Sequence, residues 1–408
     1  MLLQSPEPFY PVVIAGGGLV GASFALALES VAGSPTLVVE AGHGGSSGSS
    51  PGFDARSTAL SFGSSLILAR LGLWAELAGS AEPIREIHVS DRGHFGTVRI
   101  DCASQQVEAL GYVVENHVLG KVLHQALADS SASGLLNAAR VMEVRPMPDG
   151  MALVLDVAGE HRQIKAGVVV VADGGRSTIC SQLGIRLRTE DYQQQAIICN
   201  IAFESPHRNV AYERFTDSGP MAILPLARCH GENRGALVWT VHSQQAQSLL
   251  ALPEAELLHL LQQRFGHRLG RILRLGQRFC YPLSLTLATE QVRPGLVLLG
   301  NAAHTLHPVA GQGFNLALRD ADTLAATIGG ALLAQEDPAA MSVLQAFVAR
   351  QEQDQLRTIG FSHYLTRLFS SDRRPLVWAR KFGLASIDLI PVAKREFARQ
   401  AMGLADRF

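Results

Sequence analysis

Glycines gather where two apolar runs of the chain end, and the earlier of these places carries the clearer chemical signal. Residues 11–15 have the pattern of a buried strand, residues 16–21 follow as Gly-Gly-Gly-Leu-Val-Gly, and small residues then favour a helix. In such a strand–turn–helix unit Gly16 allows the tight turn, Gly18 lets the backbone approach a pyrophosphate, and Gly21 packs the helix against the strand. The spacing predicts a dinucleotide site.

A carboxylate stands at the position that such a site needs next. A second apolar run, residues 36–39, ends in Glu40. Its side chain can accept hydrogen bonds from both hydroxyls of a ribose and disfavours a 2′-phosphate. With a strand before the glycines, a helix after them and the acid in place, we interpret this region as nucleotide-binding rather than as a coincidental glycine-rich turn.

The second glycine-rich segment, residues 300–315, lies between the apolar run 296–299 and an Ala/Leu-rich stretch. Gly311 and Gly313 leave room for a ligand against the backbone. The helix expected to open near Phe314 would direct free N–H groups and the positive end of its dipole at the same spot. The turn therefore suits a phosphate or an electron-rich ring that accumulates negative charge.

The bulk composition fits a two-domain enzyme. The 408 residues are 47% hydrophobic and carry a net charge of −1, which leaves no electrostatic footprint for nucleic acid. The five cysteines are scattered without metal-binding spacing, so we expect no metal site and a reducing compartment. The sequence has no apolar run of about eighteen residues or more and no export signal at its start, so the expected location is the cytoplasm.

The order of the expected elements predicts an α/β protein, α+β overall. A Rossmann-like nucleotide-binding domain, with strands and helices in alternation, is interrupted by a run of short strands typical of an antiparallel sheet that would hold the substrate, with one helix near 253–265. A helical segment closes the chain. The expected division is 1–185 (with about 80–105 on the substrate side), 186–285 for the inserted β-sheet domain, 286–335 for the return to the first domain and 336–408 for the C-terminal helices.

Three segments together resemble one family. Residues 16–21, Asp173-Gly174 and residues 300–315 match, in order, the three fingerprints of the single-component FAD-dependent aromatic hydroxylases, the para-hydroxybenzoate hydroxylase-like flavoprotein monooxygenases. The match extends over essentially the whole chain. Residues 214–225 and the turn that starts at Gly300 resemble the ubiquinone-biosynthesis branch, of the 2-polyprenyl-6-methoxyphenol hydroxylase type.

The resemblance implies that FAD is the dinucleotide and assigns roles to several isolated polar residues. Arg56 would reach the pyrophosphate, the alternative being a surface ion pair. Asn116 would contact the flavin, and a plain helix N-cap is the competing interpretation. Asp173 and Gly174 would support the cofactor and the path of the nicotinamide, unless they only form an ordinary turn at the end of a strand.

The same resemblance places the flavin ring against the second glycine segment. Pro308 would hold the turn against the ring, and Asn315 would cap the start of the following helix. Backbone N–H groups and the helix dipole would stabilise the anionic reduced ring at its pyrimidine edge. The residues implied there are Gly311, Gln312, Gly313, Phe314 and Asn315.

One position departs from the family pattern. Where the third fingerprint usually has an aspartate that binds a ribityl hydroxyl, this chain has Asn301. An amide can still accept one hydrogen bond and donate another, but it loses the charge-assisted bond. We therefore expect weaker FAD binding, and a gain in affinity for Asn301→Asp.

The implied reaction is a ring hydroxylation. NADH or NADPH would reduce the FAD, O2 would give a flavin C4a-hydroperoxide, and a lipophilic phenol would take up one oxygen atom in a pocket shielded from water. Proton transfer has only weak candidates in His304 and His307, for which a structural role is favoured. Tyr212 and His242 are weaker candidates still.

The C-terminal segment bears on partners and location. From Arg367 onward, basic side chains alternate with apolar ones, a pattern that can lie on an anionic membrane surface or can pack on the catalytic domain with its charges solvated. A polyprenylated substrate would reside in the bilayer, so attachment to the inner face of the membrane or to a ubiquinone-biosynthesis complex is an open alternative. The basic residues are Arg373, Arg374, Arg380, Lys381, Lys394, Arg395 and Arg399.

Two other classes of function stay open at this point. A non-catalytic FAD-binding subunit of a biosynthetic complex would bind flavin without turnover, and Asn301 gives this alternative slight support. An NAD-dependent dehydrogenase would use the first motif alone and would leave residues 300–315 unexplained.

Overall fold

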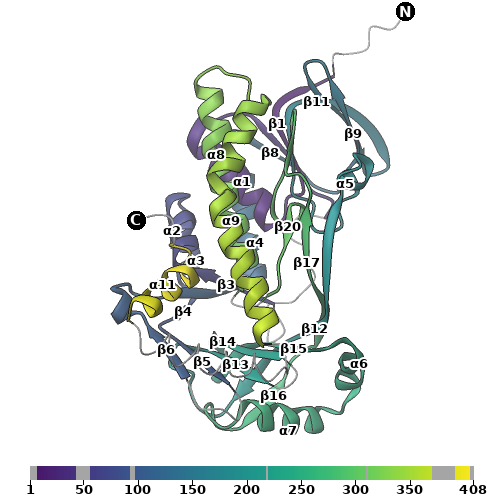
Figure 1. The fold of residues 1–408 in the computed structure, drawn as a ribbon. Helices are drawn as coiled ribbons and strands as arrows, with labels where there is room; N and C mark the ends of the chain where they lie inside the picture. Colours follow the sequence, from purple (N-terminus) through teal and green to yellow (C-terminus); the bar gives the residue numbers. More distant parts are fainter. Residues whose placement is uncertain are drawn as a thin grey trace, which may run out of the picture.

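A computed structural model of the chain describes residues 7–42, 56–91, 97–216, 219–308, 311–369 and 391–404. Two large sheets lie at opposite ends of the molecule, and the long strands β12 and β17 extend from the second sheet toward the first (Figure 1). The helices α8 and α9 run side by side along the first sheet.

Five strands of the first sheet are parallel, in the order β19-β11-β1-β2-β8. Their central residues are apolar almost without interruption, because both faces of a parallel sheet are covered. After these, β9 and β10 add an antiparallel hairpin to β11, and β18 pairs with β19. The strands are β1 (Phe9–Ala15), β2 (Thr36–Val39), β8 (Ser133–Leu136), β9 (Ala139–Met147), β10 (Gly150–Val157), β11 (Glu160–Val171), β18 (Val292–Arg293) and β19 (Leu296–Leu298).

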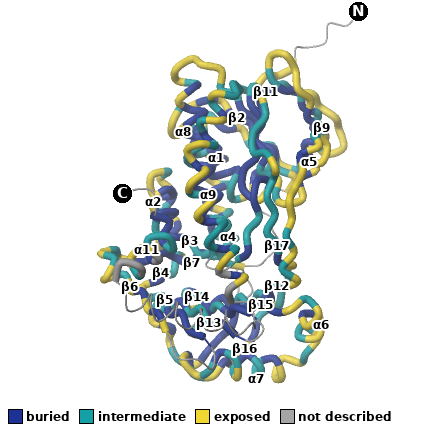
Figure 2. Tube along the Cα trace, in the orientation of Figure 1, coloured by how far each residue is buried: buried dark blue, intermediate teal, exposed yellow. Residues whose placement is uncertain are grey.

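Long helices cover one face of this sheet, and the other face packs against residues of the β9–β10 hairpin. Val12 and Ile14 of β1 enter the helix-side core, whereas Val13 and Ala15 enter the core on the other face, as strand alternation requires. Figure 2 shows the strands largely buried and the outer hairpin strand β9 exposed. The helices on the helix-covered face are α1 (Leu19–Ala32), α4 (Asn116–Asp129), α8 (Gln312–Leu333) and α9 (Met341–Phe369), whereas the short helix α5 (Thr178–Gln182) packs on the other face beside β9.

The second sheet has nine strands, eight of them in the order β20-β17-β12-β15-β14-β13-β5-β6. All its pairings are antiparallel except that of β13 with β5. Its strands are β5 (Glu86–Asp91), β6 (Thr97–Asp101), β12 (Leu187–Phe203), β13 (Val210–Thr216), β14 (Gly219–Cys229), β15 (Glu232–His242), β16 (Ile272–Leu275), β17 (Phe279–Ala288) and β20 (His304–Thr305).

Two helices, rather than the single one expected, follow β15 and pack on this sheet. The helix α7 (Glu254–Phe265) begins after Pro253, where the sequence places it, and buries Leu257, Leu261 and Phe265. The helix α6 (Ser243–Ala251) was missed because its polar first half, Ser-Gln-Gln-Ala-Gln, gives no apolar periodicity.

A small third sheet lies beside the start of α8. It consists of β3 (Ser57–Ser61), β4 (Glu82–Ile84) and β7 (Gly111–Glu115), in the order β3-β7-β4. Around it lie α2 (Phe62–Arg70), α3 (Trp74–Ala78) and α11 (Pro391–Ala401). Short 3₁₀ turns occur at η1 (Ala103–Gln105) and η2 (Gly300–Ala302).

The predicted fold class is confirmed: a Rossmann-like domain, an inserted antiparallel sheet and C-terminal helices are all present. Strands β5 and β6 join the inserted sheet, and β17 continues it to Ala288. The exact domain boundaries remain a prediction. In the part of the chain that the structure describes, no helix is both long and apolar enough to cross a membrane.

Candidate active site

The turn after β1 is built by contacts that exclude side chains. Gly16 has a φ of +105°, and a Cβ there would lie 2.5 Å from the Ala172 carbonyl oxygen. A Cβ on Gly21 would lie 2.0 Å from the carbonyl oxygen of Gly16, so only glycine lets α1 approach β1. At Gly18, by contrast, a Cβ would meet no atom within 4 Å. The open side of the turn therefore lies at Gly18, where we expect the pyrophosphate.

Glu40 stands at the end of β2, beside this turn. One carboxylate oxygen accepts a hydrogen bond from the Gly17 N–H at 2.7 Å and the other accepts one from the Gly42 N–H at 2.8 Å. Each oxygen keeps a second acceptor position. The carboxylate is thus fixed in orientation and can still bind the two hydroxyls of a ribose.

Asp173 follows β11 and lies next to the Gly16 turn. Its Oδ2 accepts a hydrogen bond from the Ser177 hydroxyl at 2.8 Å, and burial raises the pKa of the Asp173 carboxyl above its usual range. The hydrogen bond from Ser177 fits the interpretation that Asp173 forms the turn. Because Asp173 also lies beside Gly16, its support of the cofactor stays a proposal. Gly174, with a φ of +92°, lines a cavity of about 710 Å³ that lies between the turn at residues 300–315 and the second sheet.

The segment 300–315 forms η2, β20 and the start of α8, as the sequence suggested; residues 309 and 310 lie outside the described parts. Asn301 is exposed and lines the cavity, and its backbone carbonyl accepts a hydrogen bond from the Thr305 hydroxyl at 3.2 Å. Gly311 is the N-cap of α8. The predicted flavin contacts that line the cavity here are Asn301, Pro308, Gly311, Gly313, Phe314 and Asn315.

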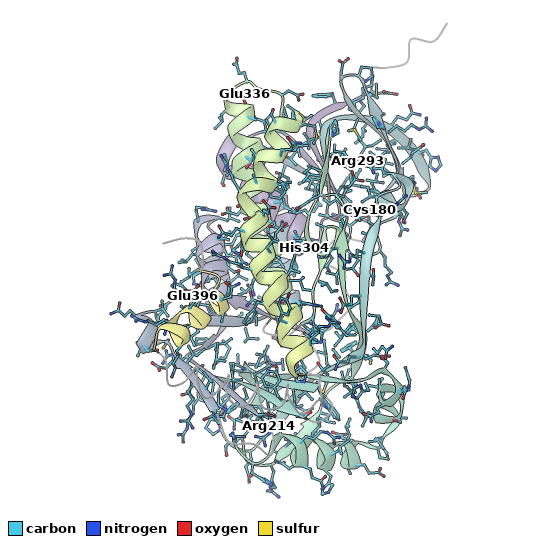
Figure 3. The ribbon with its side chains drawn as sticks, viewed as in Figure 1. Cys180, Arg214, Arg293, His304, Glu336 and Glu396 are labelled. Carbon is cyan, nitrogen blue, oxygen red and sulfur yellow. The ribbon has the colours of Figure 1, made fainter. Side chains whose placement is uncertain are left out.

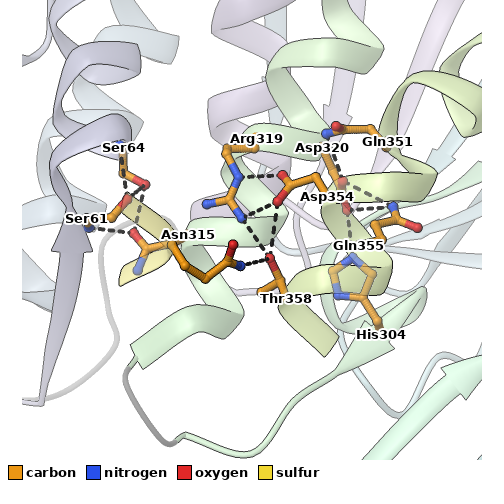
Figure 4. Close-up of polar contacts among 11 residues, drawn as sticks. Ser61, Ser64, His304, Asn315, Arg319, Asp320, Gln351, Asp354, Gln355 and Thr358 are labelled. Atoms are coloured by element: carbon orange, nitrogen blue, oxygen red, sulfur yellow. Dashed lines mark hydrogen bonds and ion pairs between the residues drawn. The ribbon is translucent and has the colours of Figure 1, made fainter. Parts of the chain in front are cut away.

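The structure corrects the role given to Asn315, which is not the cap of α8 but lies within its first turn. The Asn315 side-chain oxygen accepts hydrogen bonds from the Ser61 N–H and the Ser64 hydroxyl, at 2.8 and 2.7 Å. Its amide donates to the Ala59 and Gly311 carbonyls, at 2.8 and 2.7 Å. Asn315 therefore ties α8 to the strand β3 and the helix α2 (Figure 4).

The side chain of Gln312 does not face the cavity. It is buried, and its amide nitrogen lies 3.5 Å from the Ala401 carbonyl at the end of α11. The proposed contact of this residue with the flavin is then through its backbone N–H, in the first turn of α8.

Asn116 and Arg56 have local partners. Asn116 is the first residue of α4 rather than its N-cap, which is Glu115, and its side-chain oxygen accepts a hydrogen bond from Thr58 at 2.6 Å. Arg56 is exposed and donates to the Tyr281 hydroxyl at 3.1 Å. Neither lines the cavity, so their contacts with FAD stay proposals that require these side chains to turn.

The two histidines of the turn are buried away from the cavity. His304 Nε2 lies 2.6 Å from Asp320 Oδ2, and Asp320 also accepts hydrogen bonds from Gln351 and Gln355 of α9 (Figure 4). Burial lowers the pKa of His307 to about 4, which keeps its ring neutral. Neither histidine lines the cavity. This geometry favours the structural role over proton transfer.

The cavity of about 710 Å³ joins the turn at residues 300–315, which we call the flavin turn, to the second sheet. At one end it is lined by Gly18, Asn301 and the start of α8, and at the other by the apolar face of the strands β5, β13, β14 and β15. Glycines that leave room for a pyrophosphate, a carboxylate for a ribose and a helix start facing the cavity together fit FAD. Among the described residues, no cluster of side chains could hold a metal ion.

The sequence reasoning missed one ionisable residue in this cavity, Glu213 of β13. Glu213 is half-buried and lines the cavity, and burial raises the pKa of its carboxyl to about 7. The sequence alone carries no signal for it, because its two neighbours in the sheet, on β5 and β14, lie far apart along the chain. Of the weaker candidates, Tyr212 packs its ring on Phe265 of α7, and His242 is exposed outside the cavity.

Comparison with known proteins agrees with this site. Residues 10–346 match a family described as FAD binding domain. Ubiquinone hydroxylase UbiL of Rhodospirillum rubrum is 37% identical over 98% of this chain and 91% of its own, and 3-demethoxyubiquinol 3-hydroxylase of Escherichia coli is 31% identical over 96% and 98%. The crystal structure of p-nitrophenol 4-monooxygenase PnpA from Pseudomonas putida shares the fold, with a TM-score of 0.79, 19% identity and coverage of 98% of this chain and 100% of that one.

These matches confirm the family resemblance and FAD as the cofactor. The chain belongs to the FAD-binding-domain family of flavoprotein monooxygenases, together with the ubiquinone hydroxylases.

Proposed function

We propose that this protein is an FAD- and NAD(P)H-dependent monooxygenase that hydroxylates the ring of a polyprenylated phenol in ubiquinone biosynthesis. The observation that carries the proposal is the single cavity of about 710 Å³ that reaches from the flavin turn to an apolar sheet face. The relatives named as ubiquinone hydroxylases support the class of substrate.

The residues of the first sheet would hold the cofactor along its length. Gly16, Gly18 and Gly21 would accommodate the pyrophosphate, and Glu40 would bind the adenosine ribose. At the other end, backbone N–H groups of the first turn of α8, which follows Gly311, would face the flavin ring. Bound FAD, reduced by NADH or NADPH, supplies the electrons that activate O2 for insertion of one oxygen atom into the ring.

The second sheet would hold the phenol. Its cavity face is apolar, with Val89, Ala222 and Val238 from three different strands. Such a surface excludes water and accepts an aromatic ring with a hydrocarbon substituent. The protein's contribution is therefore to orient the ring toward the turn at 300–315 and to keep water away from the reacting atoms.

The decisive experiment supplies isotopically labelled dioxygen. Purified protein with FAD, NAD(P)H and a short-chain prenylphenol should give a product whose mass has risen by one labelled oxygen atom, and product formation should require NAD(P)H. Flavin that is reduced and reoxidised with hydrogen peroxide as the sole product would contradict the proposal, and so would a protein that binds no flavin.

We further propose that the basic C-terminal segment attaches the enzyme to the membrane that holds its substrate. Arg373, Arg374, Arg380 and Lys381 lie outside the described residues. The helix α11 beyond them packs on the domain: the Met402 carbonyl accepts a hydrogen bond from the Gly63 N–H at 2.9 Å, and Ala401 lines the cavity. A truncation at residue 367 would therefore damage the site.

Charge reversal is the cleaner test of attachment. A variant with Arg373, Arg374, Arg380 and Lys381 replaced by glutamate should float less with anionic liposomes than the unmodified protein, with each charge near the surface worth about 1 kcal/mol. Equal recovery of both proteins would contradict membrane attachment. Neutral liposomes serve as the control.

A further inference from the structure

One lateral row of the second sheet crosses six strands and faces the cavity along its whole length. Register pairs connect its members from one strand to the next. All members line the cavity, and all but one are apolar: Val98, Val89, Glu213, Ala222, Val238 and Ile198. A carboxylic acid in the middle of such a row, with Val89 on one side and Ala222 on the other, has no role in sheet packing.

Among the described residues, the carboxyl of Glu213 has no ionic partner that would explain its burial. Burial is the sole cause of its raised pKa of about 7, and no neighbouring charge contributes. Arg214, the next residue, lies on the opposite face of β13 by strand alternation. Figure 3 labels Arg214 in the second sheet. A buried acid without a partner opposes folding at neutral pH, as groups at functional sites often do.

We propose that Glu213 accepts the proton of the phenol hydroxyl and so converts the bound phenol into the more nucleophilic phenolate. This inference rests on the proposed function. The geometry supports it because the carboxylate faces the same cavity as the flavin turn and because the other cavity-lining side chains of its row are hydrocarbon.

The proton balance is simple. The phenol O–H bond breaks, its proton moves to a Glu213 carboxylate oxygen, and the electron pair stays on the phenol oxygen. When the ring carbon has taken up oxygen from O2, the ring passes through a dienone whose oxygen takes the proton back from Glu213. The displaced ring hydrogen leaves as a proton to water. The electrons come from NAD(P)H and the oxidant is O2, both supplied by the proposed function.

Few other titratable groups face Glu213. The strands beside it present Val89 and Ala222, and among the described residues that line the cavity the one other titratable residue is Tyr212. Burial raises the pKa of Tyr212 above its ordinary value, and the ring packs on Phe265 of α7. Tyr212 is therefore neutral throughout the physiological range, and a titration near neutral pH belongs to Glu213.

The test uses a phenol whose colour reports its ionisation. The oxidised holoenzyme is mixed with 2-geranyl-4-nitrophenol, whose anion is yellow and whose acid is colourless, and the absorbance of the bound probe is followed with pH. In Glu213→Gln the proton acceptor is lost while the apolar cavity remains. Because a carboxylate beside the phenol disfavours a second negative charge, the bound probe should turn yellow at a lower pH in Glu213→Gln than in the unmodified enzyme.

Two further variants make the result interpretable. Glu213→Asp keeps a carboxylate and should turn yellow at a higher pH than Glu213→Gln. Thr240→Val, at a buried polar position of the same cavity, should leave the pH of the colour change where it is. Under turnover, Glu213→Gln should lower the kcat for formation of the hydroxylated product about 10²- to 10⁴-fold without raising the KM for NAD(P)H.

The outcomes separate the two proposals. A colour change at the same pH in the unmodified enzyme, Glu213→Gln and Glu213→Asp overturns the role of Glu213 and leaves the hydroxylase proposal standing. Failure of the unmodified holoenzyme to bind the probe overturns the hydroxylase proposal itself.

Discussion

The two ends of the cavity are built in different ways. The flavin end uses backbone atoms at the ends of strands, held close by Gly16 and Gly21. The phenol end uses one side chain from each of six strands, and among the described residues that line it Glu213 is the one carboxylate. A site made of backbone turns is sensitive to added atoms, whereas a site made of a side-chain row is sensitive to chemical substitution.

The same difference decides what could be predicted from the sequence. The strand–turn–helix glycines, Glu40 and the turn at 300–315 are contiguous motifs, so the fold and the flavin end followed from them. Glu213 became visible only with the register that sets it between Val89 and Ala222, residues more than a hundred positions apart along the chain. Local caps were also misjudged, because the partners of Asn315 at Ser61 and Ser64 come from a distant segment.

The largest effect is expected at the flavin end, from a change of one glycine. Gly21→Val would force side-chain atoms into the Gly16 carbonyl, where even a Cβ would lie at 2.0 Å. Overpacking of this severity should destabilise the fold by about 3 kcal/mol or more and leave protein without flavin. The ratio of flavin to protein absorbance and the far-ultraviolet circular dichroism measure it.

Gly18→Ala is the matched control, since a Cβ there meets nothing within 4 Å. It should keep the fold and lose only FAD affinity. If Gly21→Val folds and binds FAD normally, the close approach of the α1 backbone to the Gly16 carbonyl does not define this end of the cavity.

At the phenol end, Glu213→Gln should stabilise the protein, and the gain should depend on pH. The folded pKa of about 7 lies above the ordinary value of 4.5, so folding stability falls as the pH rises from about 4.5 to about 7. Removing the acid should therefore raise the free energy of unfolding by up to about 3 kcal/mol at pH 8, and by little at pH 4. Urea denaturation at both pH values measures it.

The exposed acid Glu76 of α3 provides the comparison. Glu76→Gln should change stability by less than about 0.5 kcal/mol at either pH. A Glu213→Gln variant that is less stable than the unmodified protein at pH 8 would show that the carboxylate has a stabilising partner.

His304→Ala should act on stability and not on proton transfer. It removes a donor from the fully buried Asp320, which keeps Gln351 and Gln355. The expected loss is about 1–3 kcal/mol of folding free energy, read as a lower Tm. The pH dependence of hydroxylation should stay unchanged. If the variant loses this pH dependence while its Tm equals that of the unmodified protein, His304 is instead the proton acceptor.

The smallest effect is expected from restoring the family's acid at Asn301. This residue is exposed and lines the cavity, so Asn301→Asp should fold normally and add one charge-assisted hydrogen bond to the ribityl chain. A gain of about 1 kcal/mol corresponds to FAD binding about fivefold tighter. Fluorescence titration of the apoprotein with FAD measures it, and an unchanged or weaker affinity refutes the assignment.

The most direct test of the division between the two ends is the amount of hydroxylated product formed per NAD(P)H oxidised by Glu213→Gln. If the flavin end and the phenol end act as proposed, this variant keeps its full flavin content and continues to oxidise NAD(P)H. It should then release hydrogen peroxide with little product, from about pH 6 to about pH 8. A product yield per NAD(P)H equal to that of the unmodified enzyme would contradict the account.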